Sequence, residues 1–445
     1  MLDTMRVLIL GAGFAGSYVA RVLGQRAREI QVTLVDPRNY MLYTPLLPEA
    51  ASGTVEPRHA VVPVRVMCPR ARLLLGRATA VDMAARTATV RPVEGDPFEE
   101  EFDTLVVALG AIARTAPVPG LVEHAVGFKT IAEAIHLRNH VLQQLELAAT
   151  IDDPRERERR LTFVFVGGGY AGVEAMAELE DLVRDASRYY PTLHDVPRRW
   201  LLADAADHVL NDLRGRLGEY AARQLVRRGF DMRLTTVLTA VDADGVELSD
   251  GERVPTNTVV WTAGVRPNPL IAELGLPLDD RGRLRVDEHL RAADGVWALG
   301  DSAAVPNAAT GGAPDPPTCQ HALRQARTLA RNIAADARGR PLKVYRYRML
   351  GQAATLGRHK GVFEALGTIR FRGFPGWWLT RTYHLYQLPL MSRRLRVVGD
   401  WTVGLFFRRD VVELGSLGRP EPLEPPPPGA RRPPRARGTG HAPPR

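Results

Sequence analysis

Short runs of almost entirely apolar residues recur along the chain, and each run ends at a glycine. Such runs are typical of strands buried on both faces, because a strand with one exposed face alternates apolar and polar residues. Strands of this kind form mainly parallel sheets covered by helices on both sides, and these sheets bind ligands at the carboxyl ends of their strands. The runs are Val7–Leu10, Leu105–Leu109, Phe163–Val166, Val259–Ala263 and Val296–Leu299.

Two of these runs begin similar units, because Gly-Ala-Gly-Phe-Ala-Gly follows the first and Gly-Gly-Gly-Tyr-Ala-Gly follows the third. We therefore expect an α/β protein with two Rossmann-like dinucleotide-binding domains. A later signature at Gly300 indicates that the second domain interrupts the first, with the helical stretch 131–150 and the charged segment 152–160 bridging into it. The expected divisions are 1–125 and 266–345 for the first domain, 126–265 for the second, 346–415 for an amphipathic helical C-terminal region, and 416–445 for a disordered Pro/Arg-rich tail.

The first glycine motif carries the residues that a dinucleotide pyrophosphate needs. Gly11 makes the tight turn out of the strand, Gly13 lets the backbone approach the pyrophosphate, and Gly16 lets the helix pack closely on the sheet. Asp36 ends the next strand 20 residues after Gly16, where a carboxylate can accept both ribose hydroxyls of an adenosine. By itself this motif does not choose between FAD and NAD.

The segment around Gly300 and Asp301 favours FAD for the first domain. A strand there delivers a carboxylate onto a predicted helix start. Asp301 either caps that helix or binds the ribityl hydroxyls of a flavin, while the helix dipole favours the pyrophosphate. The residue alone supports both interpretations equally, but its pairing with a remote glycine motif and a second nucleotide domain favours the flavin.

The second glycine motif repeats the arrangement with Gly167, Gly169 and Gly172, and its expected acidic partner is Asp204. The gap exceeds the usual ~20 residues because a helix and loop intervene. A carboxylate at Asp204 favours NADH, since it would repel a 2′-phosphate. Glu174, expected on the first turn of the following helix, either complements the helix dipole or lies beside the nicotinamide and flavin, where it binds the carboxamide or relays a proton. We favour the second interpretation.

The composition excludes several classes of protein. Cys68 and Cys319 are the only cysteines and form no Cys-x-x-Cys, so we expect no disulfide framework, zinc site or iron–sulfur cluster. Disulfide and sulfide reductases of this architecture need cysteine at the flavin, and the segment 41–45 contains none. We also predict neither a signal peptide nor a membrane-spanning helix, and expect a cytosolic chain.

The net charge of +9 is concentrated near the C-terminus. From residue 370 to residue 409 the chain carries eight Arg, one Asp and three Trp (Trp377, Trp378 and Trp401). Apolar and aromatic residues recur there at helical spacing, namely Leu379, Tyr383 and Tyr386, then Val398, Trp401 and Leu405. This pattern predicts two helices lying on an anionic membrane surface. The alternative is a helical pair packed on the body or at a homodimer interface, and no nucleic-acid-binding module is recognised.

From about residue 5 to residue 413 the chain resembles the type II NADH dehydrogenases, single-subunit flavoproteins that do not pump protons. The most specific segment is Asn39–Pro48, and the others are Phe102–Gly110, Gly167–Glu174, Trp261–Val265, Ala298–Asp301, Pro317–Gln325 and Leu356–Lys360. The resemblance implies hydride transfer from NADH to FAD, followed by transfer of two electrons to a membrane quinone. Independently of the resemblance, the basic, Trp-containing segment from residue 370 to residue 409 predicts a peripheral protein on the cytoplasmic face of the membrane.

The resemblance further implies individual roles. Thr44 and Pro45 would line the isoalloxazine, Pro37, Arg38 and Val81 would lie at the adenosine, and Glu174, Gln320 and Lys360 would be catalytic. The full expected FAD set is Gly11, Ala12, Gly13, Phe14, Ala15, Gly16, Asp36, Pro37, Arg38, Thr44, Pro45, Val81, Ala108, Gly110, Gly300, Asp301, Cys319, Gln320 and Lys360. The expected NADH set is Gly167, Gly169, Tyr170, Ala171, Gly172, Glu174, Asp204, Ala263 and Gly264. The family usually has Ala at Cys319, and often Gln or His at Leu323 and Arg324, which leaves the preferred quinone open.

Two other functions remain open from the residues. One is a soluble NADH-dependent reductase of an acidic electron-carrier protein, for which the basic C-terminal region would be a docking patch. The other is an NADH-sensing flavoprotein similar to the apoptosis-inducing factors, which changes partners when it is reduced.

Overall fold

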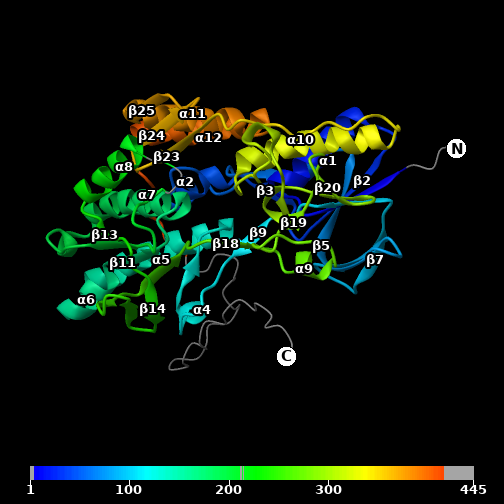
Figure 1. Ribbon diagram of the computed structural model, residues 1–445. Coiled ribbons are helices and arrows are strands. Elements are labelled where there is room, and N and C mark those ends of the chain that lie inside the picture. Colours follow the sequence, from blue (N-terminus) through cyan, green and yellow to red (C-terminus); the bar gives the residue numbers. More distant parts are fainter. Residues whose placement is uncertain (1–4, 211–212, 214, 415–445) are drawn as a thin grey trace, which may run out of the picture.

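The computed structural model describes residues 5–210, 213 and 215–414, and it is built around two sheets (Figure 1). The larger has eight strands in the order β20-β21-β8-β1-β2-β5-β6-β7, of which β21, β8, β1, β2 and β5 are parallel. These strands are β20 (Arg291–Ala293), β21 (Val296–Ala298), β8 (Thr104–Val107), β1 (Arg6–Leu10), β2 (Gln31–Asp36), β5 (Ala71–Asp82), β6 (Thr87–Pro92) and β7 (Phe98–Glu101). Helices α1 (Phe14–Arg26) and α10 (Cys319–Asp336) pack against each other beside this sheet.

The second sheet is entirely parallel, in the order β10-β17-β11-β12-β13. Its strands are β10 (Val126–Gly127), β17 (Thr258–Trp261), β11 (Thr162–Val166), β12 (Arg199–Ala203) and β13 (Asp231–Arg233). All five residues of β11 are buried, as the apolar run predicts. The neighbouring helices are α5 (Ile131–Thr150), α6 (Pro154–Arg160), α7 (Tyr170–Ala186) and α8 (Arg216–Arg227). The first turn of α5 is fixed by a capping box between Thr130 and Glu133.

The chain leaves the larger sheet after β8, builds the second sheet, and returns at β20. Strands β9 (Ala111–Ala113) and β18 (Val265–Pro267) pair antiparallel at this passage. The predicted α/β class with two Rossmann-like units is therefore confirmed. Smaller elements complete this part of the fold: α4 (Leu121–His124), α9 (Leu270–Glu273), β14 (Leu238–Val241), β15 (Gly245–Leu248), β16 (Arg253–Pro255), β19 (Leu284–Arg285) and β22 (Ala303–Ala304).

A short excursion after β2 lies between the two sheets. It consists of β3 (Tyr40–Leu42), the 3-10 helix η1 (Thr44–Leu46), α2 (Leu47–Ala51), β4 (Val61–Pro63) and α3 (Val64–Met67). Helix α2 contacts both α5 and α7, and every one of its five residues is buried. Because α2 belongs to the first unit and α7 to the second, this contact fixes the two units against each other.

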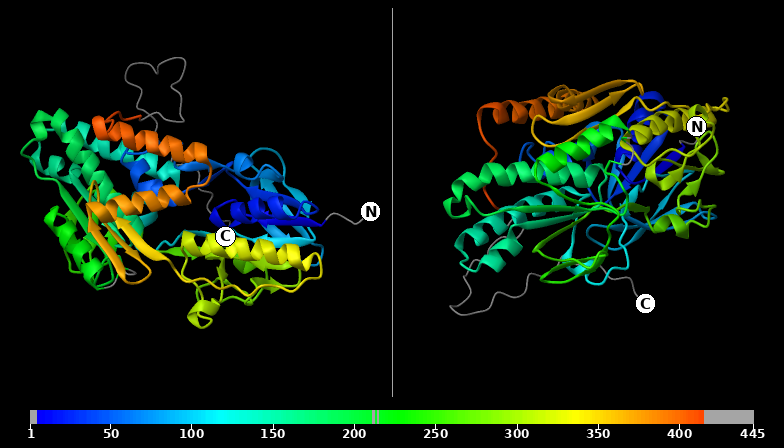
Figure 2. Two further views of the ribbon diagram at one scale, coloured as in Figure 1. Left: turned by 90° about the horizontal axis from the view of Figure 1, so that it is seen from above. Right: turned by 60° about the vertical axis from the view of Figure 1, so that its left-hand side comes forward.

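The C-terminal region begins with a three-stranded antiparallel sheet that the sequence pattern did not predict: β23 (Gly351–Thr355), β24 (Gly361–Ala365) and β25 (Ile369–Gly373). Two helices follow, α11 (Phe374–Gln387) and α12 (Met391–Phe406). Together with α10 they lie along one edge of the molecule, the upper edge in Figure 1 (see also Figure 2). The tail expected at 416–445 lies outside the described residues.

The two C-terminal helices expose less aromatic surface than expected. Trp378 is 54% exposed, but Trp377 is buried and Trp401 is half-buried. Trp377 and Trp401 are covered because the guanidinium of Arg381 stacks between their rings at 4.2 and 4.8 Å. Within the described ranges, no helix has both the length and the apolar character required to span a bilayer.

Candidate functional site

The first glycine loop has the geometry of a pyrophosphate cradle. Gly11 has φ +100°, and its N–H donates to the carbonyl of Val35 at 2.8 Å. A Cβ on Gly16 would lie 1.9 Å from the Gly11 oxygen, so only glycine permits this helix packing. A Cβ on Gly13 would meet no atom within 4 Å, which leaves the ligand side of the loop open. Each glycine therefore has the surroundings that its expected role requires.

Asp36 is buried at the end of β2 and holds this loop in place. One carboxylate oxygen accepts the N–H of Ala12 at 2.9 Å, and the other accepts the N–H of Arg38 at 2.9 Å. A carboxylate oxygen has further lone pairs, so the group can still accept ribose hydroxyls. Pro37 and Arg38 follow directly, but Val81 lies six residues beyond Leu75, the strand partner of Asp36. Six strand residues span at most about 20 Å, and the place of Val81 at the adenosine stays a prediction.

The second glycine loop repeats the first almost atom for atom. Gly167 has φ +112° and donates to the carbonyl of Ala203 at 2.9 Å, and a Cβ on Gly172 would lie 2.0 Å from the Gly167 oxygen. The Asp204 carboxylate accepts the N–H of Gly168 and, at 2.7 Å, that of Ala206. The long gap before Asp204 is filled by α7 and the 3-10 turns Ser187–Tyr189 and Pro191–Leu193. Tyr170 and Ala171 begin α7, while Ala263 and Gly264 follow β17 beside this loop.

Asp301 lies in a 3-10 turn, Gly300–Ser302, and not at the start of an α-helix. The prediction of a helix there is wrong, because the chain becomes extended at Ala303 (φ −130°, ψ 146°) and the next α-helix begins only at Cys319. Burial raises the pKa of Asp301, with Lys129 and Arg283 the cations that oppose the rise. No described residue donates a hydrogen bond to this carboxylate, so it is a desolvated acceptor suited to ribityl hydroxyls.

Two hydrogen bonds join this turn to its neighbours. The Gly300 N–H donates to Gln325 on α10 at 2.8 Å, and the Gly110 N–H at the end of β8 donates to the Ser302 hydroxyl at 2.8 Å. The N-terminus of α10, capped by Thr318, is thereby brought to Asp301. Since a helix N-terminus favours anions, α10 has the electrostatic role expected of a helix at Asp301. Neither Lys129 nor Gln325 was singled out from the sequence, because both depend on this tertiary contact.

An aromatic cluster lies where η1, α10 and α11 meet. Thr44 and Pro45 begin η1 beside Tyr43, whose ring contacts Phe14 of the first glycine loop at 5.5 Å. The Tyr43 hydroxyl donates to the backbone oxygen of His384 at 3.0 Å. Burial lowers the pKa of the His384 imidazole to about 4, so this side chain is neutral at pH 7. No sequence pattern singled out His384, because only the packing of α11 brings it here.

Cys319 and Gln320 start α10 next to this cluster. Burial raises the pKa of the Cys319 thiol to about 11, which keeps it protonated and unreactive. The Gln320 amide donates to the carbonyl of Gly351 at 3.0 Å, and its oxygen accepts the hydroxyl of Tyr347 at 3.1 Å. Gln320 therefore joins α10 to the first residue of β23.

Glu174 lies on the second turn of α7, not on the first turn as expected, because the helix begins four residues earlier at Tyr170. Its carboxylate accepts the N–H of Thr355 at 2.8 Å and the hydroxyl of Thr355 at 3.2 Å. Burial raises the pKa of Glu174 to about 8, and the carboxylates of Glu178 and Glu49 add to the rise. The side chain is therefore largely protonated at neutral pH and can donate a proton.

The structure does not bring Lys360 to Gln320. Lys360 follows the turn at the far end of β23 from Gly351, the contact of Gln320. Five strand residues span about 16 Å, more than a lysine side chain reaches. Burial lowers the pKa of Lys360, Arg228 and Arg184 lower it further, and Glu180 raises it. Lys360 thus interacts electrostatically with Glu180 and Arg184 of α7.

Four features together define a class of protein. They are the two glycine loops with their acidic partners, the unpartnered Asp301 at a third strand end, and Glu174 between the two units. This class is the two-dinucleotide flavoprotein oxidoreductases. The chain belongs to the pyridine nucleotide-disulphide oxidoreductase family, whose model matches residues 5–326, and within it to the type II NADH dehydrogenases.

Three relatives show the range of the similarity. The chain is 30% identical to a probable NADH dehydrogenase of Dictyostelium discoideum over 92% of both chains. It is 31% identical to the type II NADH:quinone oxidoreductase NdhA of Mycobacterium tuberculosis over 91% of this chain and 87% of that one. Its fold matches NDH2 of Plasmodium falciparum in complex with NADH with a TM-score of 0.86, at 17% identity and over 92% of this chain and all of the other. The expected FAD-dependent NADH dehydrogenase family is therefore confirmed.

Proposed function

We propose that the chain oxidises NADH and reduces a quinone that reaches it from a membrane surface. The observation that carries the proposal is the pair of equivalent glycine loops. Ala15 of the first loop lies beside the turn that carries the unpartnered Asp301, and the second loop leads into α7, which carries Glu174. FAD, when bound, supplies the two-electron chemistry that connects the two substrates. The protein holds both dinucleotides and controls the proton.

The residues around the first loop would hold FAD. Asp36 would accept the adenosine ribose, the open face at Gly13 would admit the pyrophosphate, and Asp301 would accept ribityl hydroxyls. Around the second loop, Gly169 is similarly open and Asp204 would accept the ribose of NADH. A charged carboxylate at that position disfavours a 2′-phosphate, so NADH would be preferred to NADPH.

Quinone reduction requires one proton from the medium. NADH releases a hydride, which carries two electrons and one proton, and the quinol that forms holds two electrons and two protons. Glu174 is the group suited to deliver the additional proton, because it is largely protonated at pH 7 and buried. The quinone ring would lie at the aromatic cluster, where Tyr43, Gln320 and the neutral His384 offer hydrogen-bonding and apolar contacts.

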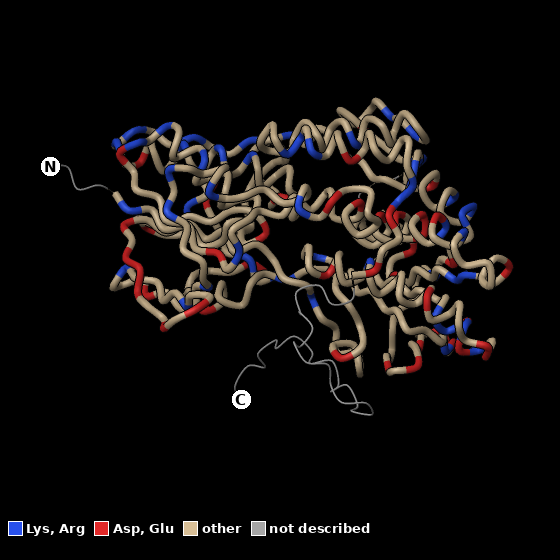
Figure 3. Tube along the Cα trace, turned by 180° about the vertical axis from the view of Figure 1, so that it is seen from behind, with Lys and Arg blue, Asp and Glu red and all other residues tan. Residues whose placement is uncertain are grey.

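The membrane-facing surface would be the edge formed by α10, α11 and α12. On α12 and just after it, Leu405, Phe406 and Phe407 are 67%, 78% and 68% exposed. On α10, Arg324, Arg327 and Arg331 recur at the spacing of one helix face, and Figure 3 shows basic residues along this edge. Exposed apolar side chains beside arginines suit a peripheral protein on anionic lipid, at the cytoplasmic face. A homodimer interface over α12 is the competing explanation for the same exposed residues.

The test is to purify the chain, record its flavin spectrum, and follow NADH oxidation with and without a short-chain quinone, and then with a long-tailed quinone in anionic liposomes. Bound FAD and quinone-dependent NADH oxidation are expected. Activity with an acidic carrier protein but not with a quinone would favour the soluble reductase. Bound FAD without turnover of any quinone would favour the NADH sensor.

A further inference from the structure

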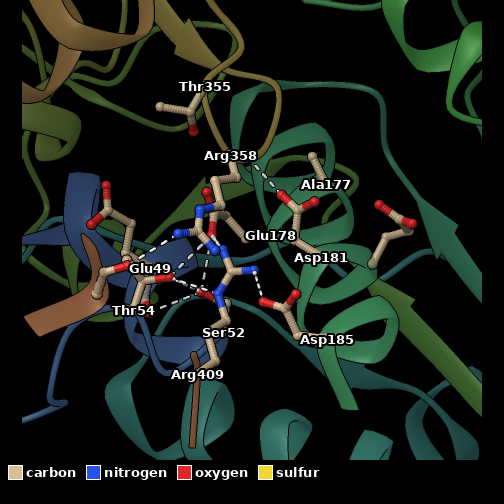
Figure 4. Close-up of polar contacts among 12 residues, drawn as sticks. Glu49, Ser52, Thr54, Ala177, Glu178, Asp181, Asp185, Thr355, Arg358 and Arg409 are labelled. Atoms are coloured by element: carbon tan, nitrogen blue, oxygen red, sulfur yellow. Dashed lines mark hydrogen bonds and ion pairs between the residues drawn. The ribbon is translucent and has the colours of Figure 1, made fainter. Parts of the chain in front are cut away.

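One face of α7 is acidic although it is buried. Glu174, Glu178, Asp181 and Asp185 follow one another at spacings of four, three and four residues, so they point to the same side of the helix. Figure 4 shows this side packed against α2, the turn after β23 and the segment that follows α12. Glu178, Asp181 and Asp185 are buried and Glu174 is half-buried, so the row requires compensation, because an unpaired buried charge is costly.

Each carboxylate except Glu174 has an arginine partner. Arg409 lies 2.8 Å from Glu178 and 3.4 Å from Asp185, and Arg228 lies 3.0 Å from Asp181. On α2, the neighbouring Glu49 lies 3.0 Å from Arg381 and accepts the indole N–H of Trp401 at 2.6 Å. In the part of the chain that the structure describes, Glu174 pairs with no cation and bonds only to Thr355.

The Glu178 carboxylate is compensated from one side only. Its Oε2 accepts from the Ser52 hydroxyl at 3.0 Å and from Arg409, but its Oε1 is buried without a partner among the described residues. Glu178 is one helical turn from Glu174, and neither hydroxyl beside it, Ser52 or Thr54, carries a charge. Arg409 is therefore the cation that balances Glu178.

Arg409 is delivered by the chain segment after α12. Its side chain is 8% exposed and also donates to the Thr54 hydroxyl at 3.0 Å. The segment continues onto α5, where Arg138 donates to the carbonyl of Asp410 and Asn139 exchanges hydrogen bonds of 3.1 and 3.3 Å with Leu414. These contacts fix Arg409 against α7 and connect the end of α12 to both units of the fold.

We infer that the ion pair between Arg409 and Glu178 sets the proton affinity of Glu174, and that Arg409 is a positioning residue for proton delivery. The inference rests on the proposed role of Glu174. A carboxylate beside an uncompensated negative charge holds its proton more tightly, and beside a net positive charge less tightly. Glu49 is the other carboxylate that acts on Glu174. The remaining charged or titratable groups around the acidic row and its partners are Asp181, Asp185, Arg138, Arg358, His359, Lys360, Glu180, Arg184, Arg381 and Arg228.

The geometry predicts that replacing Glu178 and replacing Arg409 shift the pH at which the proton is lost in opposite directions. Glu178→Gln removes a negative charge one helical turn from Glu174 and leaves Arg409 paired with Asp185 alone, so Glu174 should lose its proton at lower pH. Arg409→Gln leaves Glu178 unbalanced, so the row should hold a proton to higher pH. Each shift should be on the order of one pH unit. The double variant removes a neutral pair and should lie between the two, near the wild type.

The experiment measures NADH oxidation from pH 6 to pH 10 with a short-chain quinone and, separately, with ferricyanide, which accepts electrons without a proton. The alkaline limb of the pH profile with quinone should move to lower pH in Glu178→Gln and to higher pH in Arg409→Gln. The pH profile with ferricyanide should stay unchanged in both variants. Arg409→Lys keeps the charge and should restore most of the wild-type profile. Arg408→Gln removes the exposed neighbouring arginine and is the matched control.

The outcomes separate this inference from the proposed function. If Glu174→Gln leaves the alkaline limb intact, the proposed role of Glu174 fails. If Glu174→Gln abolishes the limb but Glu178→Gln and Arg409→Gln shift it in the same direction or not at all, the inference fails alone. FAD content and ferricyanide activity report folding of each variant, and should Arg409→Gln not fold, Glu178→Gln, Arg409→Lys and the double variant still decide the question.

Discussion

Gly13 and Gly16 of the first loop offer a matched test of the FAD site. A side chain at Gly13 would enter open space, whereas a side chain at Gly16 would clash with the protein. A Cβ on Gly13 has no atom within 4 Å, and Gly13 has an extended backbone (φ −72°, ψ −161°) that any residue adopts. A Cβ on Gly16 would lie 1.9 Å from the Gly11 oxygen and 3.1 Å from the Ile9 side chain. Gly13→Val should therefore leave the stability of the apoprotein unchanged and obstruct binding of the cofactor. Gly16→Ala should instead lower the stability of the protein itself.

The magnitudes follow from these contacts. Gly16→Ala must move α1 by more than about 1 Å to restore an ordinary contact, and overpacking of this kind costs about 1–3 kcal/mol of the free energy of unfolding. Gly13→Val adds no clash within the chain, so the apoprotein should differ from the wild-type apoprotein by less than about 0.5 kcal/mol. The same overpacking directed at the pyrophosphate should weaken FAD binding by at least about 10–100-fold.

The assay compares the absorbance of bound flavin at equal protein concentration with thermal unfolding of the FAD-stripped proteins. Gly13→Val should be purified colourless, with the melting temperature of the stripped wild type, while Gly16→Ala should melt lower. A fully yellow Gly13→Val would refute the assignment of FAD to the first loop. A stripped Gly13→Val that melts several degrees lower would refute the argument that this side of the loop faces only the ligand.

Three further predictions concern the second loop, the buried glutamate and the membrane. Asp204→Ala should narrow the preference for NADH over NADPH in steady-state kcat/KM, and a wild type that uses both equally would contradict the role of Asp204. Because the pKa of Glu174 is raised to about 8, its proton is present below that pH and lost above it. The rate of quinone reduction should therefore fall as the pH rises through 8 in the wild type, and the pH profile of Glu174→Gln should lack this fall. Replacing Leu405 and Phe406 together by Asp should release the protein from anionic liposomes in a sedimentation assay while ferricyanide reduction persists. If the variant binds liposomes as the wild type does, the membrane role of Leu405 and Phe406 is contradicted and a dimer interface is favoured.

The parts of the fold that were predictable have a local physical cause. The all-apolar run at residues 163–166 requires a strand covered on both faces, and the turns at Gly11 and Gly167 require a positive φ that glycine adopts freely. Thr130 and Glu133 supply a capping box, so the start of α5 could be placed to the residue. In each case the interactions lie within a few residues of one another.

The errors arise where distant segments decide the outcome. Asp301 resembles a helix cap in sequence, yet the chain turns away at Ala303, and the helix that reaches the site is α10, 18 residues later. Lys360 belongs to a conspicuous segment, but the hairpin of β23 and β24 holds it at the far end from Gln320. No local pattern encodes the direction of a hairpin relative to a remote helix, and so the sequence could not place either residue.

The arginines after residue 370 show why composition alone misleads. The eight arginines in this segment predicted helices with basic flanks on an anionic membrane surface, yet the side chains of Arg381 and Arg409 are only 13% and 8% exposed and pair with Glu49 and Glu178. Those two glutamates lie in segments more than 190 residues earlier, where nothing indicates that they will be buried and need cations. A charge count cannot separate arginines that meet lipid from arginines that neutralise a buried carboxylate, since both look identical in sequence. The distinction matters chemically. Arginines that meet lipid would govern where the protein encounters quinone, whereas Arg409, which neutralises a buried carboxylate, would govern the delivery of a proton to that quinone.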